Sequence, residues 1–142
     1  MIKSKNSLAK SFVIGALKYS VEEMGVALTR AAYSTNITER EDRSTAVFDP
    51  RGRLVAQAEH VPVHLGSLAV GFSKVLNYCE KEEVSLDKGS MIVANNPYLT
   101  QSHLPDIIVI KPVYLEDSLV AYVVNKGHHV DIGGSTYDKR FS

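Results

Sequence analysis

Apolar residues recur at helical spacing in two long segments of the chain. The first segment follows Ser7, a residue type that caps helices, and is expected to continue to about Tyr33. Its apolar positions are Leu8, Phe12, Ala16, Met24, Ala27, Leu28 and Ala31. The second segment runs from His64 to about Lys81, and its apolar side consists of Leu65, Leu68, Phe72, Val75, Leu76 and Cys79. The pattern predicts two main amphipathic helices.

The remaining apolar runs are short and indicate β-strands. "STAVFDPRGRLVAQA" predicts a hairpin around Asp49-Pro50-Arg51-Gly52, because proline and glycine stand where a tight turn favours them. "SMIVANN", "IIVIKPVYL" and "LVAYVVNK" predict three more strands, and the last two are joined across Glu116-Asp117. Helices and strands do not alternate regularly, which indicates an α+β fold with a largely antiparallel sheet of about five strands. With 142 residues, of which 44% are hydrophobic, residues 1–142 are expected to form a single domain.

Charge, apolar run length and cysteine content argue against several classes of protein, such as nucleic-acid-binding and membrane-spanning proteins. Sixteen basic and sixteen acidic residues cancel, so neither nucleic-acid binding nor attraction to an anionic membrane is indicated. No apolar run reaches the roughly 18 residues of a membrane-spanning helix, and the N-terminal residues do not resemble a signal peptide. The single cysteine, Cys79, excludes an internal disulfide and fits a reducing compartment. We expect a cytoplasmic protein that acts on a small molecule.

Two histidine-rich segments flank the last two predicted strands. A two-residue turn at Glu116-Asp117 pairs Leu115 with Ser118, and the same register pairs Asp106 with Gly127. "SHLPD" precedes the first of these strands and "GHHVD" follows the second, so both segments are expected at the same end of the sheet. This places His103 and Asp106 near His128 and His129. Imidazole nitrogens with a carboxylate bind zinc, manganese or ferrous iron and leave coordination positions open for water or substrate.

The first hairpin also gathers polar residues at one end, and other interpretations of them stand beside metal binding. These residues are Glu39, Glu41, Asp42, Glu59, His60 and His64. Spacing alone does not place the two hairpin ends together. His60 or His64 is expected to cap the second helix rather than to bind a metal, while Glu39 and Asp42 suit solvated charges. The pattern HxxD is common, and by itself it favours a structural turn at "SHLPD".

Three ordered blocks of sequence carry a family resemblance. They are "NITEREDRSTAVFDPRGRLVAQAEHVPVHLGS", "NNPYLTQSHLPDIIVIKPVY" and "GHHVDIGG". Together they resemble the hydantoinase B/oxoprolinase family, which includes subunits of acetone and acetophenone carboxylases. The resemblance runs from about Ala31 to Gly134 and covers only the N-terminal part of the much longer family members. The tail after Gly134 departs from the family pattern, which suggests a truncated or split subunit with its C-terminal continuation on another chain, or a homo-oligomer.

The resemblance implies a divalent-metal centre that completes a reaction begun by a hydantoinase A-like, ATP-using partner. The partner phosphorylates an amide or enolate oxygen, and the metal-bearing subunit hydrolyses or carboxylates the activated substrate. The implied metal ligands are His103, Asp106, His128 and Asp42, with Glu39 as the alternate to Asp42. His129 and Asp131 are implied to orient ligands or to handle protons in catalysis.

The resemblance therefore predicts part of a cyclic-amide hydrolase or a ketone carboxylase that holds manganese, zinc or iron. The sequence contains no phosphate-binding loop of the GxxxxGK[ST] kind, so ATP is expected only through the partner subunit. The alternative is a non-catalytic ligand-binding or assembly module derived from the same family.

Overall fold

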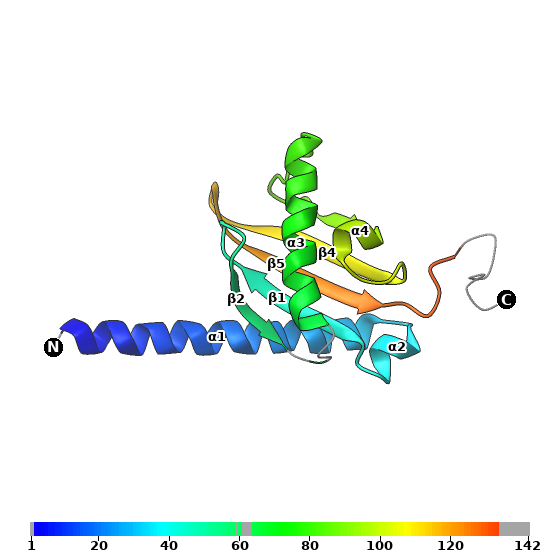
Figure 1. Cartoon of the computed structure of the whole chain (residues 1–142). Coiled ribbons are helices and arrows are strands. Elements are labelled where there is room, and N and C mark those ends of the chain that lie inside the picture. Colours follow the sequence, from blue (N-terminus) through cyan, green and yellow to red (C-terminus); the bar gives the residue numbers. More distant parts are fainter. Residues whose placement is uncertain (1, 59, 61–63, 134–142) are drawn as a thin grey trace.

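The computed structural model contains a five-stranded antiparallel sheet with a long helix on each face (Figure 1). It describes residues 2–58, 60 and 64–133, without the side chains of residues 2–6, 64 and 65. The helices are α1 (Ile2–Ala31), α2 (Thr35–Thr38), α3 (His64–Lys81) and α4 (Pro97–Thr100). The strands are β1 (Arg43–Phe48), β2 (Leu54–Ala58), β3 (Ile92–Ala94), β4 (Asp106–Leu115) and β5 (Ser118–His128). The predicted α+β fold with its two main helices is confirmed.

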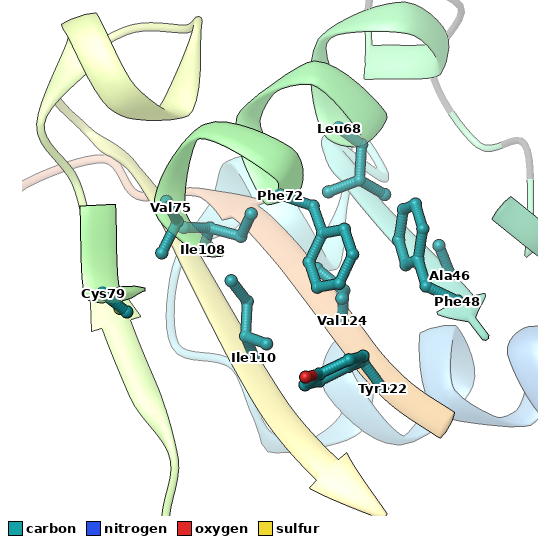
Figure 2. Close-up of a cluster of buried hydrophobic side chains, with 10 residues drawn as sticks. All are labelled: Ala46, Phe48, Leu68, Phe72, Val75, Cys79, Ile108, Ile110, Tyr122 and Val124. Carbon is teal, nitrogen blue, oxygen red and sulfur yellow. The ribbon is translucent and has the colours of Figure 1, made fainter. Parts of the chain in front are cut away.

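The larger core lies between the sheet and α3, as Figure 2 shows. Phe72 of α3 is fully buried and stacks on Phe48 of β1, with 4.0 Å between the ring centroids. The ring of Tyr122 on β5 meets Phe72 edge to face at 5.4 Å. The other buried members of this core are Ala46, Leu68, Val75, Cys79, Ile108, Ile110 and Val124. The predicted apolar side of α3 is therefore confirmed at Leu68, Phe72, Val75 and Cys79, and Leu76 packs partly buried against the same core. The side chain of Leu65 lies outside the described residues.

Helix α1 packs on the opposite face of the sheet. Val21 of α1 is buried against Val47 of β1, whereas the neighbouring Phe48 points towards α3, because successive side chains of a strand alternate between faces. The predicted helix start at Ser7 is wrong, since α1 begins at Ile2 and includes Ser7. The N-terminal half of α1 extends beyond the edge of the sheet (Figure 1).

This projecting half of α1 exposes a second apolar stripe. Leu8, Phe12 and Tyr19 are 70%, 78% and 67% exposed. At 100° per residue these three positions share the side of the helix opposite to Val21. α1 is therefore apolar on two sides, and only one of them packs against this sheet. Among the described residues, no helix combines the length and the apolar character needed to span a membrane.

Both predicted hairpin connections are present. Asp49 Oδ1 accepts hydrogen bonds from the N–H groups of Arg51 and Arg53, and Gly52 has a positive φ of 77°, which glycine adopts without strain. The register of the second hairpin differs from the prediction by one residue. Leu115 pairs with Ser118 as expected, but an irregularity between Val113 and Tyr114 shifts the ladder.

Candidate metal centre

The strand order β2-β1-β5-β4-β3 brings the two histidine-rich and acidic segments to one end of the sheet. β5 lies between β1 and β4 and is antiparallel to both, so its last residues lie beside the first residues of both neighbours (Figure 1). Arg43 pairs with Gly127 on one side of β5, and Asp106 pairs with His128 on the other. The predicted pairing of Asp106 with Gly127 is therefore wrong, and the bulge in this hairpin is the reason.

Asp106 is the buried centre of a cluster with two histidines. Its carboxylate is fully buried; Oδ2 accepts a hydrogen bond from the main-chain N–H of His103 at 2.9 Å, and Oδ1 lies 2.6 Å from Nδ1 of His128. Nδ1 of His103 lies 3.5 Å from Oδ2. The two imidazole rings meet edge to face, with their centroids 5.8 Å apart. The sequence prediction that His103, Asp106 and His128 lie close together agrees with this geometry.

Hydrogen bonding keeps Asp106 ionised in spite of its burial. Burial by itself raises the pKa of a carboxyl group, because it disfavours the charged form. The main-chain N–H of His103 and the side chains of His128 and Ser102 oppose this effect, and the pKa of Asp106 falls below its ordinary value of 3.8. The cluster therefore offers a carboxylate anion at neutral pH.

The arrangement fits a divalent metal ion. Each of His103, Asp106 and His128 offers one ligand atom, and these atoms lie within 4.8 Å of one another. Two imidazole nitrogens and one carboxylate oxygen suit zinc, manganese or ferrous iron. The side chain of His103 is 67% exposed while that of Asp106 is fully buried, so the cluster opens to solvent on the His103 side. Chemically it resembles an open site in which water or a substrate oxygen completes the coordination.

Asp42 lies beside this cluster, whereas Glu39 lies three residues earlier in the chain, at the end of α2. The main-chain carbonyl of Asp42 accepts a hydrogen bond from the N–H of His128 at 3.0 Å. Its side-chain charge acts on the buried ammonium group of Lys126. Glu39 is exposed at the C-terminal end of α2. Neither residue belongs to the group of three whose ligand atoms converge.

The two residues predicted to assist catalysis lie on the segment that leaves β5. The N–H of His129 donates to the carbonyl of Pro105 at 3.0 Å, which ties this segment to the loop carrying His103. Ser34 Oγ donates to the carbonyl of His128 and accepts from the N–H of Val130. Asp131 is exposed, and its carboxylate accepts from the N–H of Gly133. The main chain of this segment is thus fixed, while the side chains of His129 and Asp131 lie outside the converging group.

The remaining candidates of the first hairpin lie elsewhere or outside the described residues. His60 Nε2 lies 3.7 Å from Glu22 of α1, and His60 is not in the converging group. Glu59 and the side chain of His64 are not among the described residues, so the predicted cap of α3 remains a prediction.

Sequence reasoning missed Lys126, a fully buried lysine next to the cluster. Its Nζ donates to Ser67 Oγ at 3.2 Å and to the carbonyl of Thr100 at 3.4 Å. Burial lowers the pKa of Lys126, and the negative charges of Asp106 and Asp42 oppose this effect. A signal was present in the sequence, because the period of two along β5 places Lys126 on the same face as Val124 and His128.

Comparison with known proteins identifies relatives of most of the chain. The model of the family described as hydantoinase B/oxoprolinase matches residues 9–139. The 5-oxoprolinase 1 of Arabidopsis thaliana is 46% identical over 115 residues, which cover 81% of this chain and 9% of the plant protein.

Two solved structures share the fold. The ATP-dependent caprolactamase from Pseudomonas jessenii superposes with a TM-score of 0.75 at 29% identity, and the match covers 92% of this chain and 22% of that chain. A nucleotide-free acetone carboxylase superposes with a TM-score of 0.77 at 13% identity, covering 89% of this chain and 17% of that chain. At 13% identity the second likeness concerns the fold alone. The chain spans less than a quarter of the length of each of these three proteins.

Proposed function

The chain belongs to the hydantoinase B/oxoprolinase family, and from this premise we propose that it holds the divalent metal ion of an ATP-dependent enzyme that hydrolyses cyclic amides. The observation that carries the proposal is the ionised, buried carboxylate of Asp106 between the imidazoles of His103 and His128. Two relatives support the substrate class, since their names refer to 5-oxoproline and to caprolactam, which are both cyclic amides.

Each residue of the proposed centre has a distinct task. Asp106 supplies the anionic ligand, and its contact with Nδ1 of His128 fixes the orientation of that imidazole. His103 is exposed and lies on the side from which a substrate arrives. A divalent ion held by these residues would polarise a carbonyl group or stabilise a negatively charged oxygen.

Asp42 is the preferred fourth ligand. It immediately precedes β1 and contacts His128 through its main chain, whereas Glu39 is exposed at the end of α2. His129 adjoins His128, and Asp131 lies three residues after His128, which supports a role for both side chains in exchanging protons with substrate or water.

ATP enters this function through a partner subunit of the hydantoinase A kind. The 142 residues contain no GxxxxGK[ST] loop, whose main-chain N–H groups bind phosphates in many ATP-using proteins. The caprolactamase is named as ATP-dependent. In this proposal the partner would activate the amide oxygen by phosphate transfer, and His103, Asp106 and His128 would hold the ion that assists hydrolysis. Carboxylation of a ketone is a second candidate, supported by the likeness of fold to acetone carboxylase.

Metal binding is the first test of the proposal. After reconstitution with manganese, zinc or ferrous iron and removal of excess metal, elemental analysis is expected to give about one ion per chain. His103→Ala and His128→Ala are expected to abolish binding. His60→Ala is the matched control, because His60 lies by Glu22 of α1 and outside the converging group. A wild-type chain without metal after reconstitution supports the alternative of a non-catalytic binding or assembly module.

Coupled turnover is the second test. We expect no ATP hydrolysis by this chain alone. Combined with an ATP-using partner and the remaining parts of a family subunit, it is expected to support ATP hydrolysis coupled to 5-oxoproline or caprolactam. Asp106→Ala is expected to reduce that turnover by orders of magnitude, because it removes a charged ligand. Full coupled turnover by Asp106→Ala, with metal still bound, contradicts the proposed role of the cluster.

A further inference from the structure

The carbonyl of Thr100 marks the start of the loop that carries His103. Thr100 ends α4, is fully buried, and lies three positions before His103. Its carbonyl accepts a hydrogen bond from the ammonium group of Lys126 at 3.4 Å. The same carbonyl oxygen lies close to α3 at Gly71, where an added Cβ atom would be only 2.6 Å from it. One main-chain group is therefore fixed from two sides, by a strand and by a helix.

We propose that Lys126 and Gly71 are positioning residues that set the place of His103 in the metal centre. Gly71 allows the Thr100 carbonyl to approach α3, and Lys126 holds that carbonyl to β5. This inference rests on the proposed metal-binding function of the cluster.

The short loop between Thr100 and Asp106 explains why His103 needs such an anchor. The loop begins with Gln101 in a left-handed conformation, with φ of 56°. It ends at Asp106, whose carboxylate binds the N–H of His103. The His103 side chain is 67% exposed, so packing contributes little to its position. The imidazole is placed mainly by the two ends of the loop, and a shift of the Thr100 carbonyl moves His103 relative to His128.

The variant Gly71→Ala distinguishes this positioning role from an effect of charge. Lys126 is also the positive group that faces Asp106 and Asp42, so its replacement changes both the anchor and the charge of the centre. Gly71→Ala keeps every charge and fills the space that the Thr100 carbonyl occupies beside α3. The Cβ atom meets main-chain atoms of Thr100 at 2.6, 3.1 and 3.3 Å, and these cannot move aside as the end of a flexible side chain can.

The test compares Gly71→Ala and Lys126→Met with Gly66→Ala in the full chain. Gly66 lies on the same helix, and a Cβ atom there meets nothing within 4 Å. Manganese or zinc affinity, measured by calorimetry, is expected to fall at least about tenfold in the first two variants, as for other residues that orient ligands. Gly66→Ala is expected to keep the wild-type affinity.

A metal-free measurement distinguishes positioning from general damage to the fold. In wild-type protein, NMR is expected to detect a contact between the rings of His103 and His128, whose centroids lie 5.8 Å apart. Gly71→Ala is expected to lose this contact while keeping the contact between Phe72 and Tyr122 in the core. Gly71→Ala remains decisive if Lys126→Met does not fold, because it keeps every charge.

A folded Gly71→Ala variant with wild-type metal affinity and an unchanged ring contact overturns the inference. If wild-type protein binds no metal, the proposed function fails, but the metal-free ring contact still decides whether Gly71 and Lys126 position His103.

Discussion

Replacing Asp106 with alanine is expected to destabilise the metal-free chain by about 3 kcal/mol. The donors that lose their acceptor include the N–H of His103 at 2.9 Å and Nδ1 of His128 at 2.6 Å. Hydrogen bonds to charged groups each contribute about 1.5–3 kcal/mol, and removing one member of a buried pair costs about 3–5 kcal/mol. The lower end applies because both histidines reach solvent, where water replaces part of the lost interaction. Asp106→Asn keeps one oxygen acceptor and is expected to cost about half as much.

Urea unfolding with a chelator present measures this effect without a contribution from metal. The chain has no tryptophan, so far-UV circular dichroism is the suitable signal. Asp117→Ala is the control, since Asp117 is an exposed aspartate in the turn between β4 and β5 and is expected to change stability by at most about 0.5 kcal/mol.

The pH dependence supplies an independent check with a definite sign. The folded-state pKa of Asp106 lies below 3.8, so its stabilising contribution is present above the unfolded-state pKa and is lost as pH falls through the folded-state value. The difference between wild type and Asp106→Ala is therefore expected to be present at neutral pH and to shrink as pH falls below about 4. Equal unfolding free energies for the two proteins at neutral pH, or a difference that persists undiminished in acid, refute this reasoning.

Three further predictions address metal binding, packing and association. Metal affinity is expected to fall as pH drops through the usual histidine range near ~6.5, because imidazole ligands must be deprotonated. Equal metal affinities measured about one pH unit above and about one pH unit below this value contradict the prediction. Gly127→Ala is expected to lower the unfolding free energy by about 1–3 kcal/mol, because its Cβ atom would lie 2.8 Å from Cδ1 of the buried Ile37. Gly15→Ala, which meets nothing within 4 Å, is the control in the same thermal denaturation experiment. The isolated chain is expected to self-associate through the exposed stripe of α1, so Phe12→Ser lowers the mass seen by light scattering, whereas a monomeric wild type argues against this.

Local sequence patterns were sufficient where neighbouring residues decide the structure. The apolar spacing predicted α3 with its ends at His64 and Lys81, because one side of a helix must be buried and both ends of the apolar pattern are clear. The Asp49-Pro50-Arg51-Gly52 turn was equally predictable, since its side-chain and main-chain preferences are local. The start of α1 was not, because the apolar repeat begins at Leu8 while the helix extends to Ile2 through polar residues that tolerate it.

The proposed metal centre shows most clearly which features the sequence predicted and which depended on the tertiary structure. The sequence placed "SHLPD" before one strand and "GHHVD" after its hairpin partner, so a short turn brought the two segments together. In the structure Asp106 begins β4 and His128 ends β5. The exact pairing required the bulge near Val113, because a single extra residue shifts every later pair and no local pattern marked it.

Only the tertiary structure decided how the two hairpins and β3 lie next to each other. A period of two shows that a strand is present but carries no information about its neighbour, and the insertion of β5 between β1 and β4 is what brings Asp42 beside His128. The burial of Lys126 has the same origin. Its place on the inner face of β5 follows from alternation, but its contacts with Ser67 and Thr100 depend on how α3 and α4 pack over that face. The sequence by itself thus determined the types of ligand and the strands that carry them, whereas long-range packing, which no local pattern encodes, decided how those ligands are oriented.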